Sequence, residues 1–272
     1  MKNWFYGALA TCSFELRRSF TLQRTAVSIV LALFPPVMLG LLIFGSEMSG
    51  EAQARSIIQD FSKLITVLLV SLVCVLSLLL WATPNVYSEL EGKSWSFVAS
   101  RPGGRISILL GKYLASFIVS FAISMVAISF CVLLVNQRLG IEGPLQLWTA
   151  LCGVYVFGCS AYAAVFSLIG TFFIKRAMVV AAGYLIGSDI VMASIPGALI
   201  NKLTIRHHLQ EIGINWIGWF VPGSTEEDFR MVFGSGLPVS IHILIVIATT
   251  LLALALGGWI IVNREYITSD QT

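Results

Sequence analysis

The chain has 272 residues, of which 57% are hydrophobic and only 11% are charged. This composition excludes a soluble globular domain, and at about 20 apolar residues per crossing it leaves room for roughly six transmembrane helices. The net charge of +3 is small, so the placement of the charges is more informative than their sum.

The N-terminal segment, residues 1–25, is predicted to form an amphipathic helix on the membrane surface. Its apolar residues recur at spacings of three and four: Phe5, Leu9, Cys12, Leu16 and Phe20. Charged residues lie mostly off this stripe, as is typical of interfacial helices. A signal peptide is the alternative, but charge interrupts the first apolar stretch and no small-residue cleavage site follows it.

Long apolar runs then predict an all-α integral membrane fold, a single domain over residues 1–272. The runs are continuous rather than alternating, which argues against a β-barrel. Six transmembrane helices are predicted at about residues 26–45, 64–82, 106–135, 147–174, 177–200 and 239–262. Two of the runs exceed the ordinary length of a span, so we expect those helices to tilt or to extend beyond the bilayer.

The segment from Tyr87 to Arg105 is polar and lies between the second and third apolar runs. At 100° per residue, most of its apolar side chains fall on one half of a helix, Glu89 and Lys93 face away, and Glu91 intrudes on the apolar side. A proline and two glycines after Arg101 end that helix. The segment is therefore predicted to be a short amphipathic helix that passes an applied force to the second and third spans.

The lysines and arginines predict the orientation in the membrane. Most of the 17 lie in the N-terminal segment, the 87–105 loop, the Lys175-Arg176 turn and the C-terminal tail. By the positive-inside rule, both termini and the 87–105 loop are predicted to be cytoplasmic.

The loop and the run after it contain the pattern Glu89-x-Glu91-x-x-Ser94, then seven residues, then Pro102-x-x-Arg105 and Ile108-Leu-Leu-Gly-Lys112. This pattern resembles the signature of ABC-2 type transporter permeases, which typically read E-x-E-x-G-T, seven residues, P-x-x-R and an ILLGK-like start of the third span. Lys93 stands where the family has glycine, and Ser94 where it has threonine. The resemblance in architecture extends over the whole chain.

The resemblance implies a permease subunit of an ATP-driven exporter, placed in a bacterial-type inner membrane among its lipids. It would pair with a second permease copy, identical or a sister, and bind a separate cytoplasmic ATPase. In relatives, a coupling helix after the second span sits in a cleft of that ATPase. Carried onto this chain, Glu89, Glu91 and Lys93 would make polar contacts with the ATPase.

The resemblance also assigns roles to the rest of the loop. Trp95 and Phe97 would pack into the cleft or under the interfacial helix, and Arg101 and Arg105 would clamp acidic groups or lipid phosphates. ATP and Mg²⁺ would be bound by the partner, because the Gly92-Lys93-Ser94 sequence lacks the earlier glycine and the preceding strand of a phosphate-binding loop. No enzymatic activity, cofactor, metal or nucleic acid is expected for the chain itself.

Two other functions remain open at this point. A membrane scaffold or assembly protein could recruit a soluble partner through the same loop without transport. The loop could also be a solvated turn whose charges only keep it out of the membrane. An intramembrane hydrolase is less favoured, because the sequence has neither a GxSG-type serine nor an HExxH motif.

Asp189 lies near the middle of the predicted fifth span, where an unpaired carboxyl group is costly. It is interpreted either as a polar group on the translocation path or as a hydrogen-bonded group that joins helices, with Ser188 or Ser194 nearby. Gly183 and Gly187, one turn apart just before it, permit close helix approach.

The connection at 201–238 carries an apolar stretch with two tryptophans that is too short to cross the bilayer. It is predicted to be an external re-entrant or interfacial segment, with an ordinary surface loop as the alternative. His207 and His208 are adjacent and face different directions, so metal binding is not expected there. His242 is interpreted as a satisfied interfacial residue.

Overall fold

The computed structural model describes residues 2–47, 68–84, 86–91, 95, 100–101, 103–139, 143–192, 201–217 and 236–266. All regular structure in these ranges is helical. The labelled helices are α1 (Lys2–Ser19), α2 (Leu22–Glu47), α4 (Tyr87–Glu91), α6 (Gly104–Leu139), α7 (Pro144–Phe172), α8 (Ala177–Leu185), α9 (Ile205–Ile217) and α11 (Val239–Asn263). A further helix covers residues 68–82 and is called the second-span helix below.

Five helical segments are long and apolar enough to cross a membrane, which defines a multi-pass membrane protein. They are Leu22–Phe44, Leu68–Glu91, Gly104–Arg138, Pro144–Phe172 and Val239–Asn263. Each overlaps one of the predicted spans. The second candidate combines the second-span helix with α4, and the predicted residues 64–67 lie outside the described ranges.

The predicted fifth span, 177–200, has a different outcome. Its first part is α8, which continues as a π-helix at Ile186–Val191. The apolar helix Ala177–Asp189 is shorter than a full crossing. Residues 193–200 lie outside the described ranges, so the six-span layout stays a prediction.

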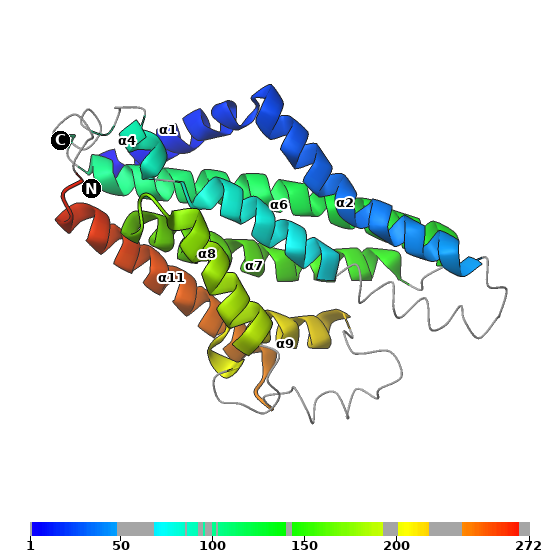
Figure 1. Cartoon of the computed structure of the whole chain (residues 1–272). Helices are drawn as coiled ribbons and strands as arrows, with labels where there is room; N and C mark the ends of the chain where they lie inside the picture. Colours follow the sequence, from blue (N-terminus) through cyan, green and yellow to red (C-terminus); the bar gives the residue numbers. More distant parts are fainter. Residues whose placement is uncertain are drawn as a thin grey trace.

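The bundle is organised around α6, which contacts α1, α2, α7 and α11 (Figure 1). Its main core lies between the second-span helix, α6 and α7, and includes the fully buried Leu78, Ile128 and Phe166. The 36 residues of α6 span about 54 Å at 1.5 Å per residue, whereas the hydrocarbon core is about 30 Å thick. Parts of α6 therefore extend beyond the bilayer or the helix tilts, as predicted.

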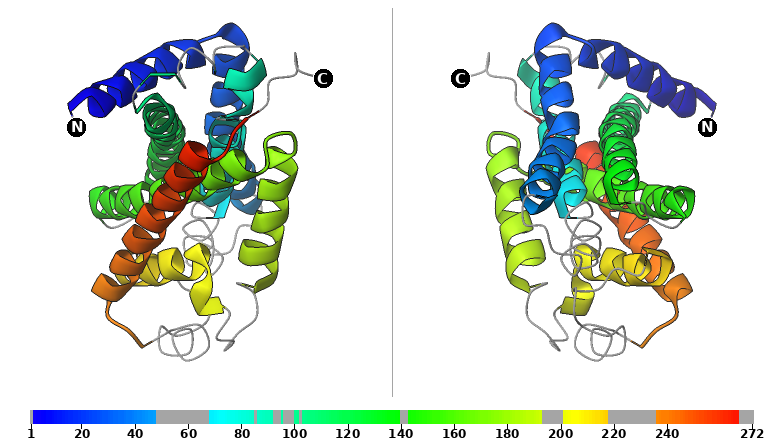
Figure 2. Two further views of the ribbon diagram at one scale, coloured as in Figure 1. Left: turned by 90° about the vertical axis from the view of Figure 1, so that its left-hand side faces the viewer. Right: turned by 90° about the vertical axis from the view of Figure 1, so that its right-hand side faces the viewer.

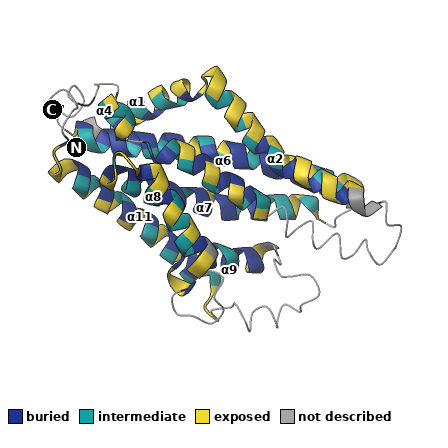
Figure 3. Cartoon of the chain, viewed as in Figure 1, coloured by how far each residue is buried: buried dark blue, intermediate teal, exposed yellow. Residues whose placement is uncertain are grey.

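The outer faces of the helices are apolar. Val30, Leu41, Leu244 and Trp259 are 64–67% exposed, and similar residues continue along α2 and α11 (Figure 3). Such continuous apolar surface is rare on soluble proteins and fits contact with lipid tails.

The helix α1 packs lengthwise against the start of α6, beginning at the end of the bundle where α11 finishes (Figures 1 and 2). The contact uses small residues: Gly7 lies against Ser107, and Ala8 and Thr11 lie against Gly111. As a result, only part of the predicted apolar stripe is buried. Its Cys12 is buried, whereas Phe5, Leu9 and Phe20 are exposed, because the small residues on another face allow the closer approach to α6.

Candidate functional site

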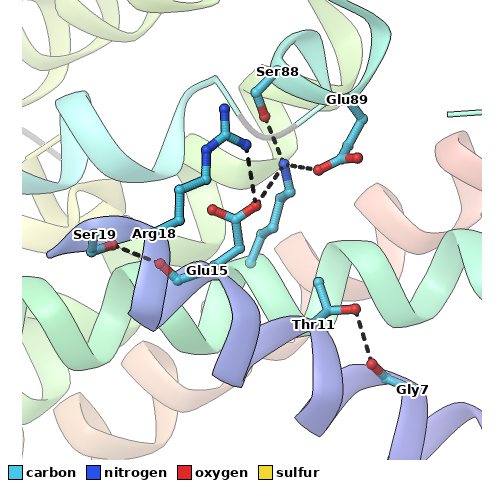
Figure 4. A network of polar contacts seen from close by, with 8 residues as sticks. Gly7, Thr11, Glu15, Arg18, Ser19, Ser88 and Glu89 are labelled. Carbon is cyan, nitrogen blue, oxygen red and sulfur yellow. Dashed lines mark hydrogen bonds and ion pairs between the residues drawn. The ribbon is translucent and has the colours of Figure 1, made fainter. Parts of the chain in front are cut away.

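A buried lysine lies where the loop after the second span meets α1 and α6. The Lys112 side chain, in α6, is only 4% exposed. Its Nζ lies 2.6 Å from Glu89 Oε1 and 3.3 Å from Glu15 Oε1, and it donates a hydrogen bond of 2.6 Å to Ser88 Oγ (Figure 4). A buried ammonium is costly unless it is paired and hydrogen-bonded, and these partners meet that need. These four residues are called the Lys112 network.

The Lys112 network joins three helices. Glu15 belongs to α1, Ser88 and Glu89 belong to α4, and Lys112 belongs to α6. Arg18 adds a longer contact of 3.9 Å to Glu15, but its side chain is 44% exposed, so this pair contributes little. Because α4 directly follows the second span, a displacement of α4 would be passed to α1 and α6.

Trp95 gives the loop a second attachment. The side chain is 4% exposed and packs edge-to-face on Tyr266, with ring centroids 4.9 Å apart. Val86, Ile108 and Ile261 belong to the same buried cluster. The loop is thus attached to the start of α6 and to the segment that follows α11.

Arginine side chains satisfy carbonyls at the ends of two helices nearby. Arg105 Nη1 donates to the carbonyl oxygen of Val262 (2.8 Å), and Arg264 Nη1 donates to that of Phe172 (2.6 Å). The Tyr266 hydroxyl donates to the carbonyl one residue before Phe172. The last carbonyls of a helix have no partner within it, and its C-terminus favours cations, so these contacts stabilise the ends of α7 and α11.

The two predicted acidic contact residues, Glu89 and Glu91, show the reverse of the expected exposure. Glu89, predicted to face away from the apolar side, has a side chain only 12% exposed and pairs with Lys112. Glu91, predicted on the apolar side, is exposed. Both glutamates belong to α4, and the side of α4 that faces α6 is the one that carries Glu89, because Glu89 pairs with Lys112.

The other predicted loop residues fall into two groups. Trp95 and Arg105 are engaged inside the chain, while Arg101 is exposed. Lys93 and Phe97 lie outside the described ranges. Contact of any of these residues with a partner protein stays a prediction.

Sequence reasoning missed the centre of this site. Lys112 entered only as part of the ILLGK pattern, and Glu15 only as a charge off the apolar stripe. The available signal was a single lysine two turns into an otherwise apolar run of about 30 residues, where an unpaired charge is costly.

Asp189 lies in the π-helix and is 7% exposed. Its carboxylate accepts hydrogen bonds from the Tyr162 hydroxyl on α7 and from Ser188 Oγ. Arg206 Nη1, from α9, donates to the Asp189 backbone carbonyl at 2.7 Å. These contacts favour the interpretation of Asp189 as a group that joins helices.

Gly183 and Gly187 lie on α8 and the π-helix, at the side of the bundle (Figure 2). A Cβ added at either position would meet no atom within 4 Å. Within the part of the chain that the structure describes, no other helix packs closely on these glycines, so their role in helix packing stays a prediction.

All three histidines of the chain meet between α9 and α11. The rings of His207, His208 and His242 lie with centroids 5.0–6.0 Å apart, and the Nδ1 atoms of His208 and His242 are 2.8 Å apart. Burial, together with the charges of His208, His242 and Lys202, lowers the pKa of His207 to about 4. The pKa of His208 is lowered by burial and by His242.

The thermal stability of the chain is expected to fall by a few degrees as the pH is lowered from 7.5 to 5. The His207 pKa is about 4 in the fold and 6.5 ordinarily, so between these values the unfolded state binds the proton first and acid favours unfolding. The variant His207→Gln should show a weaker pH dependence of the melting temperature in detergent. The neighbouring Lys202 and Glu211 are the same in the wild type and in the variant. If the melting temperatures of the two proteins depend equally on pH, His207 is not the group responsible.

A scan against models of protein families and a search of curated proteins each found no match. A functional proposal for this chain therefore depends on its own residues and their arrangement.

Proposed function

We propose that the chain is the membrane subunit of an ABC-2 type exporter. It would form the translocation pathway as a dimer and couple through residues 87–105 to a separate cytoplasmic ATPase. The observation that supports this most is the Lys112 network, which attaches the loop after the second span to α1 and α6 through a buried charge. The family pattern occupies the same stretch of sequence.

A loop held in this way is suited to transmit motion. When the ATPase closes on nucleotide, it would push on α4. The ion pair between Glu89 and Lys112 would carry that displacement into α6, and the contact between Trp95 and Tyr266 would carry it to the end of α11. These helices are three of the elements that build the bundle, so their joint movement would change access to the pathway.

The surface that meets the ATPase is assigned to the exposed side of the loop. Glu89 and Trp95 are engaged inside the chain, which leaves Arg101 as an exposed charge for the partner. Charges at the rim of an interface mainly set partner choice and association rate. We place this face, the start of α1 and the end of α11 on the cytoplasmic side of a bacterial-type inner membrane.

The variant Arg101→Glu is expected to reduce capture of the proposed ATPase partner by about tenfold, because charge reversal at a rim opposes encounter. Capture on tagged permease and ATP hydrolysis in proteoliposomes are the measurements. The control is Arg138→Glu, an exposed arginine at the opposite end of α6. Undiminished capture and transport by the Arg101 variant would contradict the coupling role, and capture without substrate-dependent ATP hydrolysis would favour a scaffold.

A further inference from the structure

A cavity of about 240 Å³ lies beside the Lys112 network. It is lined by residues of α1, the start of α2, the end of the second-span helix, α4 and α6. Sites for drug-sized ligands have volumes of about 300–1,000 Å³, so this cavity suits a smaller polar group.

The charges around the cavity balance. Arg18, Arg24 and Lys112 line it together with Glu15 and Glu91, and a third carboxylate, that of Glu89, is bound to Lys112. An anion would leave this balanced set with an uncompensated charge. A ligand that carries one positive and one negative group would keep the charges of the cavity balanced.

Two of these charges are available to a ligand. Glu15 is already paired with Lys112 and Arg18. Arg24 on α2 and Glu91 on α4 form no ion pair with any residue in the described ranges. The cavity therefore offers one guanidinium and one carboxylate that have no ion-pair partner within the described ranges.

Trp81 provides an independent indication of a ligand. It lines the cavity, and its indole Nε1 is buried without a hydrogen-bond partner in the described part of the chain. A buried donor without an acceptor is costly and rare. A phosphate oxygen in the cavity would satisfy this donor.

The position of the cavity indicates that the ligand comes from the bilayer. Phe20 and Leu22, at the elbow between α1 and α2, are 80% and 89% exposed. They adjoin Ser19 and Arg24, which line the cavity. Large apolar side chains exposed beside arginines are typical of segments at the level of lipid headgroups.

We propose that this cavity binds the headgroup of a zwitterionic phospholipid with a primary ammonium, of the phosphatidylethanolamine type. The phosphate accepts hydrogen bonds from Trp81 Nε1 and the Arg24 guanidinium, and the ammonium donates to the Glu91 carboxylate. The bound lipid connects α2, the second-span helix and α4, so its occupancy stabilises the position of the loop. The site uses Glu91 of the loop but binds the lipid without any partner protein, so the proposal does not depend on the exporter function.

The test is native mass spectrometry of the delipidated full-length chain, titrated with phosphatidylethanolamine, phosphatidylcholine and phosphatidylglycerol of matched acyl chains. Phosphatidylethanolamine is expected to bind about tenfold more tightly than the other two, since phosphatidylcholine lacks ammonium N–H donors and phosphatidylglycerol lacks the cation. Equal binding of the three lipids would overturn the proposal. So would displacement of the bound lipid by inorganic phosphate at equal concentration.

Variants then locate the site. Trp81→Phe keeps an aromatic ring and removes the part of the indole that carries the N–H, and Arg24→Gln removes the charge; each is expected to weaken phosphatidylethanolamine binding about tenfold. Arg17→Gln is the matched control, because Arg17 is exposed beside Arg18 and does not line the cavity. Binding by both cavity variants at the wild-type level would reject this location.

Discussion

Replacing Lys112 by methionine is expected to lower the free energy of unfolding by about 3–5 kcal/mol, the usual effect of removing one partner from a buried ion pair. The substitution keeps most of the length of the unbranched side chain and removes its charge. The Glu15 and Glu89 side chains, each 12% exposed, would then lose the ammonium group that both of them contact. Two carboxylates left in that position repel each other and lose the hydrogen bonds that compensate their burial.

The measurement is the unfolding equilibrium in mixed detergent micelles, followed by tryptophan fluorescence. Lys175→Met is the control, since Lys175 is exposed in the turn between α7 and α8 and its loss should change stability by less than about 0.5 kcal/mol. A triple variant that adds Glu15→Gln and Glu89→Gln should recover most of the loss, because removal of the complete charge set is often nearly neutral. If Lys112→Met and Lys175→Met are equally stable, the network contributes nothing to the fold.

The membrane helices could be predicted from the sequence because long apolar runs leave the backbone few alternatives. The run predicted at 147–174 corresponds to α7 at Pro144–Phe172, and the run predicted at 239–262 corresponds to α11 at Val239–Asn263. In lipid, a helix satisfies all of its backbone hydrogen bonds internally, so hydropathy alone indicates both the type and the approximate ends of such segments.

The polar site could not be predicted in the same way, because its partners are brought together by packing. Nothing near Lys112 in the sequence indicates that it meets Glu15 and Glu89, which lie on two other helices. The orientation of the side chains in the loop could not be predicted from helical periodicity either. A single helical period fitted across residues 87–98 reverses the faces of Glu89 and Glu91, because the period does not show that Glu89 pairs with Lys112.

The histidines show the same limit. Adjacency in the sequence predicts different directions for His207 and His208, yet both side chains are buried and their ring centroids lie 5.4 Å apart. The third ring, that of His242, comes from α11 and meets both of them. Only the tertiary contact between α9 and α11 creates the cluster.

Replacing Gly170 by alanine is expected to destabilise the fold by about 1–3 kcal/mol, the usual effect of overpacking a tight site. A Cβ on Gly170 of α7 would lie 2.4 Å from the backbone carbonyl oxygen of Thr83. No side-chain rotation relieves contact with a backbone atom, so α7 and the end of the second-span helix must separate. Because Thr83 lies just before α4, the separation would also displace the carboxylate that pairs with Lys112.

The control is the same substitution at Gly258, which lies in α11 and would place its Cβ more than 4 Å from any atom that the structure describes. Alanine is favoured over glycine within a helix by up to about 1 kcal/mol, so Gly258→Ala should be neutral or stabilising. One chemical change at two helical glycines is thus expected to give effects of opposite sign in the same micellar unfolding measurement. If Gly170→Ala is as stable as Gly258→Ala, α7 does not approach Thr83 this closely, and the loop after the second span is not held against α7.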